Sequence, residues 1–256
     1  MFHVFRNAFP LMNSGKVNPS IGWFHHLTTR PTGMVEGKVC IALVSGGLDS
    51  PVAIARALKQ GWNIHPVHCS QEPVVGPEAE QKTIAALQHF LTADGPIGDA
   101  ARAQIQPSLT VVPVAEHLAL FTEKWAHTEY FIHMKRMYHH LADFKAADVG
   151  ATHLLTGENL GQVSSQTLGN LGSIEQASSL KPLRPLLGFD KNTIIRMSRV
   201  LGVFELSLGP EVCDALGPTT PVTIANQEWL EKSEQRAGGL HEICQAAWNN
   251  RREVSL

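Results

Sequence analysis

The clearest hydrophobic pattern in the chain lies between residues 39 and 61. An apolar run of strand length, residues 39–44, ends at Ser45-Gly46-Gly47, where two glycines can take positive φ without a Cβ clash. Ser50 is a favoured helix N-cap, and apolar residues then recur with helical spacing until Gly61. The pattern predicts a strand, a glycine turn and a helix in immediate succession.

Strand-like and helix-like patterns alternate along the rest of the chain. Strands are predicted over residues 63–69, 109–114 and 152–156, and helices over residues 77–91, 131–148, 190–202 (capped by Asp190) and from about 222 to 250 with an interruption near Gly238-Gly239. Pro66 indicates an irregularity or a sheet edge, and the Gly- and Ala-rich residues 94–107 are predicted to be a connection. The alternation favours a doubly wound α/β sheet.

Length and composition favour one domain of this class. The 256 residues, 43% hydrophobic and 17% charged, suffice to bury a good core. Residues 1–36 show no periodicity and are predicted to be an irregular arm, whereas residues 37–256 are predicted to be the domain, with C-terminal helices from about residue 222. No apolar run approaches the roughly 20 residues of a membrane span, which favours a cytoplasmic protein without membrane contact.

The net charge and the spacing of the cysteines exclude further classes of function and of site. The net charge of −2 excludes a globally basic nucleic-acid binder, so any RNA role must come from local motifs or a partner. Four cysteines lie far apart without a C-x-x-C pair: Cys40, Cys69, Cys213 and Cys244. This spacing argues against a disulfide framework and a four-cysteine zinc site, and an iron–sulfur cluster would need three or four converging thiolates. Any cysteine with a functional role is therefore predicted to be a reactive thiol.

The glycine turn after the first strand has the chemistry of an anion site. Its backbone N–H groups and the positive end of the following helix point to one spot, although an ordinary βα loop would show similar residues. The P-loop pattern fails, because no Gly-Lys-Ser/Thr follows and the first basic residue, Arg56, lies inside the helix. A second glycine-bearing loop, residues 157–162, follows another strand, and two such loops in one sheet favour a nucleotide site.

The segment Ser45-Gly46-Gly47-Leu48-Asp49-Ser50 resembles the SGGxDS loop of the PP-loop ATP pyrophosphatases. These enzymes split ATP into AMP and pyrophosphate while adenylating an acceptor. The resemblance implies that Ser45, Gly46, Gly47 and Ser50 cradle the pyrophosphate. It gives Asp49 a catalytic role through Mg²⁺, since a carboxylate beside phosphates requires a cation; no other metal ligand is predicted.

Three motifs together resemble the tRNA 4-thiouridine synthases, or tRNA sulfurtransferases, within this superfamily. They are SGGLDSPVA, TGENLGQVSSQTL (residues 156–168) and LRPLLGFDK (residues 183–191), in the family's order and within a resemblance that covers about residues 37–220. The resemblance implies a mainly parallel five-stranded sheet with helices on both faces. It also implies that the enzyme adenylates a uridine oxygen with ATP and replaces it with sulfur.

The family's functional residues carry over to matching positions. ATP contacts fall on Leu43, Val44, His68, Cys69, Lys135, Gly157 and Gln166. Lys191 matches an essential lysine that would stabilise charge on the leaving pyrophosphate, although it also reads as a first-turn helix residue. Cys213 matches the sulfur-handling cysteine, which must be partly exposed and substantially thiolate to react. Cys69 is an alternative second thiol.

Two departures from the family shape the expected partners. Family members place a ferredoxin-like segment and a tRNA-binding THUMP domain before the PP-loop, and many bacterial members add a rhodanese domain. Only 36 residues precede the domain here, and Leu216 occupies the position of a second cysteine found in archaeal types. We therefore expect tRNA capture with help from a partner protein and a sulfide or persulfide donor such as a cysteine desulfurase. A homodimer stays open.

Two other functions stay open at this stage. One is a PP-loop enzyme with another acceptor, through small-molecule thiolation for thiazole synthesis or through ligase or amidotransferase chemistry. The other is a non-catalytic nucleotide-binding subunit that handles tRNA, against which the intact Asp49, Lys191 and Cys213 argue.

Overall fold

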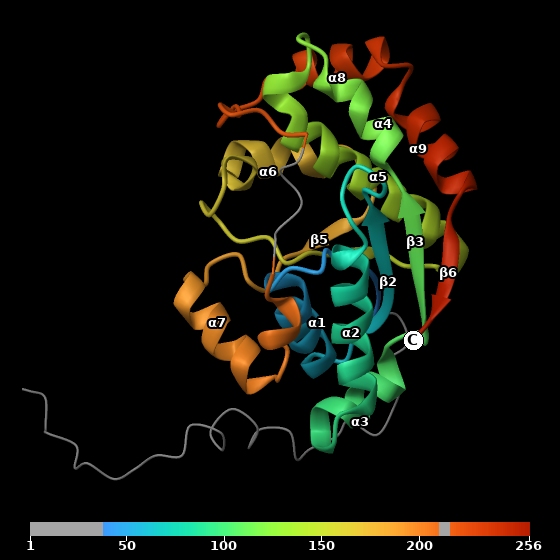
Figure 1. Cartoon of the computed structure of the whole chain (residues 1–256), viewed down its shortest axis with the longest axis vertical. Helices are drawn as coiled ribbons and strands as arrows, with labels where there is room; N and C mark the ends of the chain where they lie inside the picture. Colours follow the sequence, from blue (N-terminus) through green and yellow to red (C-terminus); the bar gives the residue numbers. More distant parts are fainter. Residues whose placement is uncertain (1–37, 210–215) are drawn as a thin grey trace, which may run out of the picture. The chain divides into compact units, whose positions relative to one another are not determined.

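The sheet is the central element of the structure. The computed structural model describes residues 38–209 and 216–256, and within them six strands form one sheet in the order β5-β4-β1-β2-β3-β6 (Figure 1). The strands are β1 (Val39–Leu43), β2 (Asn63–Ser70), β3 (Ser108–Pro113), β4 (His153–Leu155), β5 (Lys181–Leu183) and β6 (Arg252–Ser255). Neighbouring strands are parallel except β3 and β6, which are antiparallel. The predicted fold class is confirmed, with a sixth strand added.

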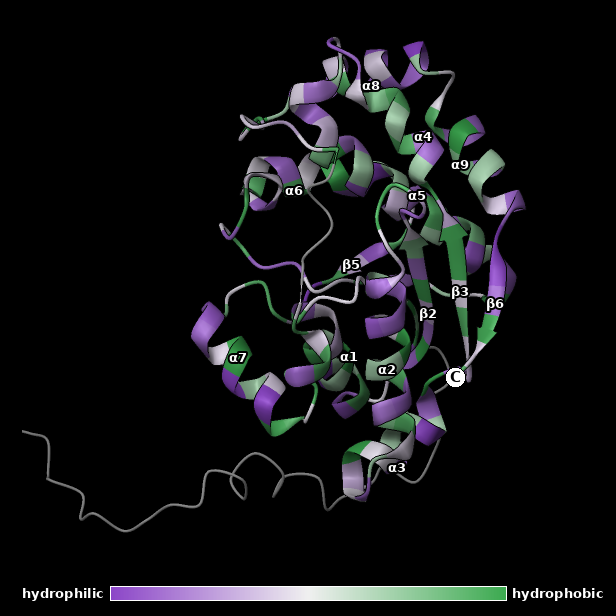
Figure 2. Ribbon diagram, in the orientation of Figure 1, coloured by the Kyte–Doolittle hydropathy of each residue, from purple (hydrophilic) through white to green (hydrophobic). Residues whose placement is uncertain are grey.

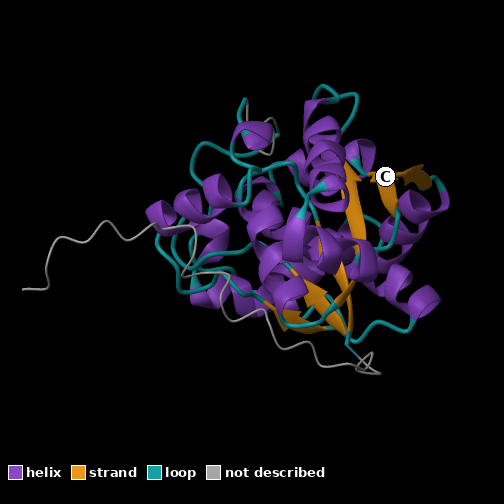
Figure 3. Ribbon diagram, turned by 90° about the horizontal axis from the view of Figure 1, so that it is seen from below, coloured by secondary structure: helices purple, strands orange, loops and turns teal. Residues whose placement is uncertain are grey.

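Helices cover both faces of this sheet (Figure 3). The α-helices are α1 (Asp49–Lys59), α2 (Glu78–Thr92), α3 (Gly95–Gln104), α4 (Ala115–Ala119), α5 (Tyr130–Val149), α6 (Leu168–Glu175), α7 (Lys191–Val200), α8 (Gln227–Arg236) and α9 (Leu240–Asn249). Short 3₁₀ helices are η1 (Leu120–Thr122), η2 (His127–Glu129), η3 (Ser164–Gln166) and η4 (Glu205–Ser207). Among the described residues, no helix has both the length and the apolar character needed to cross a membrane.

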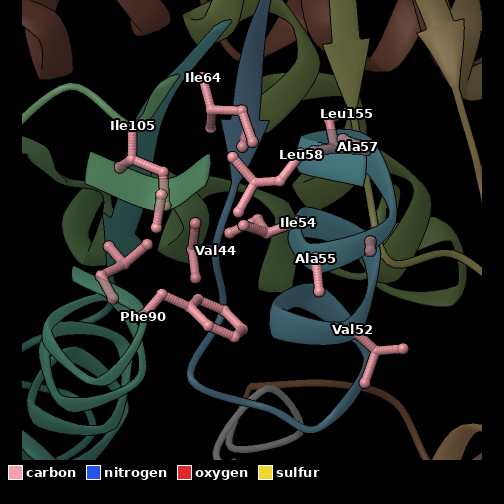
Figure 4. Close-up of a cluster of buried hydrophobic side chains, with 14 of the residues drawn as sticks. Val44, Val52, Ile54, Ala55, Ala57, Leu58, Ile64, Phe90, Ile105 and Leu155 are labelled. Atoms are coloured by element: carbon pink, nitrogen blue, oxygen red, sulfur yellow. The ribbon is translucent and has the colours of Figure 1, made fainter. Parts of the chain in front are cut away.

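The core is split by the sheet because successive strand residues face opposite sides. In β1, Cys40 and Ala42 join the cluster under α1, α2, α3 and α7, whereas Ile41 joins the cluster under α4, α5 and α9. Figure 4 shows the first cluster, where Ile54 and Leu58 of α1 meet Ile64 of β2. The carboxyl ends of β1, β2 and β4 are thereby held between two packed helical layers.

The predicted connection over residues 94–107 is wrong, because residues 95–104 form α3. Gly98 lies inside this helix where a Cβ would come 1.8 Å from the carbonyl oxygen of Ala93. Arg102 donates to the same carbonyl at 2.9 Å. The glycine therefore permits a close contact inside a helix, which the sequence pattern does not distinguish from a loop glycine.

The edges of the sheet also differ from the prediction. Pro66 does not mark an edge, since β2 lies between β1 and β3. Its missing N–H is tolerated because the ladder with β3 begins only at Val67, one residue later. The edge next to β3 is β6, whose short and largely hydrophilic sequence carries little strand signal of its own (Figure 2).

Candidate functional site

A cavity of about 660 Å³ opens at the carboxyl ends of β1, β2 and β4. In doubly wound sheets this edge is where ligands bind. Thirteen predicted site residues line it: Leu43, Val44, Ser45, Gly46, Gly47, Asp49, Ser50, His68, Cys69, Lys135, Gly157, Gln166 and Lys191. The fourteenth, Cys213, lies outside the described residues, as does the predicted arm over residues 1–36. The structure thus brings together residues that are far apart in the sequence.

The glycine loop holds its shape through one close backbone approach. Gly46 has a φ of 75°, and a Cβ there would lie 2.3 Å from the carbonyl oxygen of Ala79 in α2. Any other residue would both strain the backbone and clash with α2. The loop can therefore stay close to α2 only with glycine at this position.

The helix after the loop begins without a side-chain cap. Its N-cap is Leu48, so the predicted N-cap role of Ser50 is wrong. Ser50 lies inside α1, and its hydroxyl accepts a long hydrogen bond of 3.4 Å from the backbone N–H of Ser45. Because no side chain caps the first N–H groups of α1, this end of the helix can accept an anion.

A partly exposed ion pair joins Asp49 and Lys191 at this end of α1. The Lys191 ammonium donates to the two Asp49 carboxylate oxygens at 3.0 and 3.1 Å, and Gln162 Oε1 lies 3.5 Å away. The Lys191 side chain is 44% exposed and the Asp49 side chain 23%. Lys191 begins α7, where the Asp190 carboxylate accepts from the Thr193 N–H at 2.9 Å, as the predicted cap requires. Two predicted catalytic residues therefore touch each other.

Glu158 forms a buried charge cluster with Lys135 and Arg184. Its carboxylate accepts from Lys135 Nζ at 2.8 Å and from Arg184 Nε at 2.6 Å. The side chains of Glu158 and Arg184 are each 7% exposed, and Arg184 also pairs with Glu175. Burial alone raises the pKa of Glu158, but Lys135, His139 and Arg184 outweigh it and hold that pKa far below its usual range. We call Glu158, Lys135 and Arg184 the Glu158 cluster.

Gly157 allows this wall to approach the start of α1. A Cβ at Gly157 would lie 2.8 Å from the Asp49 carbonyl carbon and from the Ser50 nitrogen. Gly157 is expected to contact ATP. The structure adds a second reason for glycine at this position, because a side chain here would clash with the backbone at the start of α1. The loop after β4 and the glycine loop consequently form one continuous surface.

Comparison with known proteins places the chain in a family. The family model described as "Thiamine biosynthesis protein (ThiI)" matches residues 34–238. The chain belongs to this family. Two curated relatives, each named "Probable tRNA sulfurtransferase", come from Staphylococcus aureus (strain JH1) and Thermus thermophilus; both are 35% identical, over 77% and 79% of this chain and 47% and 48% of their own lengths. The chain thus spans about half the length of the curated relatives that it matches.

A solved relative shares the fold of this ThiI-family chain. It is described as the crystal structure of a 4-thiouridine synthetase–RNA complex with bound ATP, with 30% sequence identity and a TM-score of 0.76. The match covers 86% of this chain and 55% of that chain. The resemblance stated from the three sequence motifs is therefore confirmed.

The two predicted ATP contacts at the end of β2 are His68 and Cys69, and burial shifts the pKa of both. His68 is 3% exposed, and its Nδ1 lies 2.8 Å from the Val44 carbonyl oxygen, which fixes that nitrogen as the donor. Burial lowers the pKa of His68, so the ring is neutral at physiological pH. Burial raises the pKa of the Cys69 thiol far above its usual range. A protonated thiol does not suit Cys69 as the second sulfur nucleophile.

The chain on both sides of the undescribed residues 210–215 lies near the cavity. Pro218 and Pro221 line it, and the Leu216 carbonyl lies 3.0 Å from His127 Nε2. On the other side, the Cβ position of Gly209 is 3.7 Å from the ammonium of Lys82, another lining residue.

Sequence reasoning missed several polar residues of this ThiI-family cavity. Glu158 belongs to the motif TGENLGQ, and a charged residue three positions after a buried strand was the available signal. Gln71 and Gln162 were missed, whereas Gln166 was predicted. Each of these three lining glutamines leaves one buried amide atom without a protein partner: Gln71 Oε1, Gln162 Nε2 and Gln166 Oε1. Buried polar atoms without partners are costly, and these three atoms are available to hydrogen-bond a polar ligand.

Proposed function

We propose that this chain is an ATP-dependent tRNA sulfurtransferase that adenylates O4 of a tRNA uridine and replaces that oxygen with sulfur, giving 4-thiouridine. Its family, its curated relatives and the ATP-bound, RNA-bound neighbour support the proposal. The observation that carries it is the meeting of all three sequence motifs in one cavity, beside the uncapped start of α1.

The cavity suits a nucleoside triphosphate. Its polar end holds the glycine loop and the start of α1, which favour phosphate, and its unpaired glutamine atoms can bond a polar ligand. The described residues contain no group of three metal-ligating side chains. Asp49 would therefore hold Mg²⁺ together with ATP phosphates and water, as is usual for this ion, and the ion would neutralise phosphate charge.

The first chemical step joins the acceptor oxygen to the α-phosphorus of ATP and breaks the bond to the β-phosphate, so that pyrophosphate leaves. Lys191, which contacts Asp49, would stabilise the charge on that leaving group once it exchanges Asp49 for phosphate. In the second step a hydrosulfide attacks C4 and AMP leaves with the original oxygen, which gives 4-thiouridine directly. If a persulfide attacks instead, AMP leaves in the same way and the product is a disulfide between the C4 sulfur and the donor sulfur. A second thiol then attacks the donor sulfur, forms a disulfide with it and releases the C4 sulfur. Adenylation is required because the unmodified oxygen is a poor leaving group.

The partners follow from this chemistry. We propose tRNA as the acceptor, captured with help from a partner protein, and a sulfide or persulfide donor such as a cysteine desulfurase. Since tRNA is the substrate, the cytoplasm is the proposed site of action. Cys213 is proposed to receive or resolve the persulfide; the residues on both sides of its segment lie near the cavity.

The full chain with labelled ATP, unmodified tRNA and either donor tests the proposal. We expect equal amounts of AMP and pyrophosphate, together with 4-thiouridine in the tRNA. Pyrophosphate release with small acceptors but not with tRNA would instead support small-molecule thiolation. ATP binding without turnover under every donor and partner would favour a non-catalytic subunit.

Single-turnover thiolation of Cys213→Ser separates sulfur transfer from adenylation. We expect intact ATP binding but no thiolation from a persulfide donor, with mass spectrometry showing the persulfide only on the unmodified protein. Cys69→Ser serves as the comparison and should retain thiolation, because the raised pKa of its half-buried thiol keeps the thiol protonated. Full activity of Cys213→Ser with a persulfide donor would remove Cys213 from the mechanism.

A further inference from the structure

Gln71 follows directly after β2 and lines the cavity. Its amide nitrogen donates to the Tyr138 hydroxyl at 3.0 Å and to the Met134 sulfur at 3.7 Å, both from α5. Its carbonyl oxygen Oε1 is buried and has no partner in the described structure. The two donor contacts therefore orient the amide and leave one acceptor for a ligand.

The surroundings of Gln71 suit a flat base more than a phosphate or a sugar. Met134 contacts Gln71, and Cys69, Val75 and Phe131 also line the cavity; Val75 and Met134 are buried. The glycine loop, residues 45–47, and Lys191 line the cavity at the start of α1, and the basic Lys135 beside Met134 is paired with Glu158. Apolar walls with one polar group that fixes orientation are typical of sites for the base of a nucleotide.

The order of the strands indicates which base this is. β1 runs into the glycine loop, and β2 is its hydrogen-bonded neighbour, so the ends of the two strands lie side by side. A nucleotide with its phosphates at the start of α1 can extend its base across the end of β2 toward Gln71. The base nearest to Gln71 is then the base of ATP, not the base of the acceptor.

We propose that Gln71 makes the site specific for adenine: its Oε1 accepts a hydrogen bond from the 6-amino group of ATP. This inference rests on the proposed ATP site. A guanine base would bring its O6, a second acceptor, toward Oε1, so GTP would leave both oxygens unpaired and in repulsion. Tyr138 is a positioning residue in this arrangement because it orients the amide.

A ligand and protein double-mutant cycle tests the contact. Titration calorimetry would measure the affinity of the full chain and of Gln71→Leu for ATP, GTP and purine riboside 5′-triphosphate, which lacks the 6-amino group. We expect the unmodified protein to prefer ATP over the purine analogue by about tenfold, as for one hydrogen bond, and Gln71→Leu to bind the two equally. In Gln71→Leu, the affinity for GTP should also come closer to the affinity for ATP.

Two further variants keep the test independent of folding. Gln88→Leu changes the same residue type at an exposed position of α2 and should keep the preference for ATP. Tyr138→Phe should weaken the preference without abolishing it, because the amide loses one of its two orienting partners. Thermal unfolding of each variant shows that the folded state is being compared.

Equal loss of affinity for ATP and the purine analogue in Gln71→Leu would overturn the proposal, since it would indicate packing alone. Unchanged ATP affinity with a raised KM for tRNA would also overturn it, because Gln71 would then face the acceptor. If the unmodified protein binds none of the three nucleotides, the proposed function itself fails, which these outcomes distinguish.

Discussion

Two groups of charges face the same cavity but differ in burial. The Glu158 cluster is fixed among β4, α5 and the chain after β5, with side chains 7–17% exposed. The Asp49–Lys191 pair joins the starts of α1 and α7, with side chains 23% and 44% exposed. The first group has little access to water, whereas the second can exchange partners with water or a ligand.

This difference in burial gives the two charge groups different roles. A partly exposed pair contributes only about 0–1 kcal/mol to stability, so phosphate or a cation can replace either partner at small cost. Removing one member of a buried cluster costs about 3–5 kcal/mol, because an uncompensated charge stays behind. The Glu158 cluster therefore maintains the shape of the cavity, and the Asp49–Lys191 pair is available for chemistry.

The largest expected effect on stability comes from Glu158→Gln. The change leaves Lys135 without its counter-charge and Arg184 with Glu175 alone in a buried wall, so the free energy of unfolding should fall by about 3–5 kcal/mol in urea titrations. Glu228→Gln removes one partner of an exposed helix pair with Lys232 and should cost no more than about 0.5 kcal/mol. Similar costs for both variants would remove the distinction between the two charge groups.

Asp49→Ala is expected to affect turnover and hardly stability. Release of AMP should fall by about 10²–10³-fold or more, since the residue that faces the phosphates is lost. The free energy of unfolding should change by no more than about 1 kcal/mol, because the pair with Lys191 is partly exposed. Asp99→Ala, which breaks the exposed pair with Arg102 in α3, is the matched control and should leave turnover unchanged. A destabilised Asp49→Ala protein would contradict the comparison.

The smallest predicted effect is a pH dependence from His139, which lies beside the Glu158 cluster. Burial lowers the pKa of His139 to about 4, with Arg184 and Lys135 acting in the same direction and Glu158 against it. The unfolded chain binds this proton near pH 6.5, so acid favours the unfolded state. The stability from His139 is complete above pH 6.5 and is lost as pH falls toward 4, by at most about 3 kcal/mol.

Urea titrations at pH 7 and pH 5 would measure this slope. His139→Gln should show a shallower loss of stability between the two values than the unmodified protein. His68, which is also buried with a lowered pKa, adds a slope of the same sign in both proteins, so the difference between them isolates His139. An unchanged slope in His139→Gln would show that His139 is not held neutral by the fold.

The sequence analysis names both members of the Asp49–Lys191 pair as site residues without predicting their contact, and of the Glu158 cluster it names only Lys135. Asp49 and Lys191 lie in motifs that resemble those of a known family, and their predicted roles follow from that resemblance. The partners of Glu158 are 23 and 26 residues away in the chain, and only the folded sheet brings them together. The role of Glu158 therefore depends on tertiary packing that no local pattern records.

The prediction of the fold from the sequence has the same limit, because local patterns do not record tertiary contacts. The main strands and helices follow from hydrophobic period, but Ser50 lies inside α1 and closes the glycine loop instead of capping the helix. Gly98 lies within α3 because of a contact with Ala93, and β6 is a strand because it pairs with β3. In each case a neighbour in space decides the structure, and the local sequence carries the opposite or no signal.

A crystal structure of the full chain with a non-hydrolysable ATP analogue tests the central claim most directly. We predict that the phosphates lie at the Ser45–Gly47 loop and the start of α1, and that Lys191 has left Asp49 for a phosphate oxygen. Glu158 should keep both of its bonds to Lys135 and Arg184. An analogue bound elsewhere, or a disrupted Glu158 cluster beside an intact Asp49–Lys191 pair, would contradict the account.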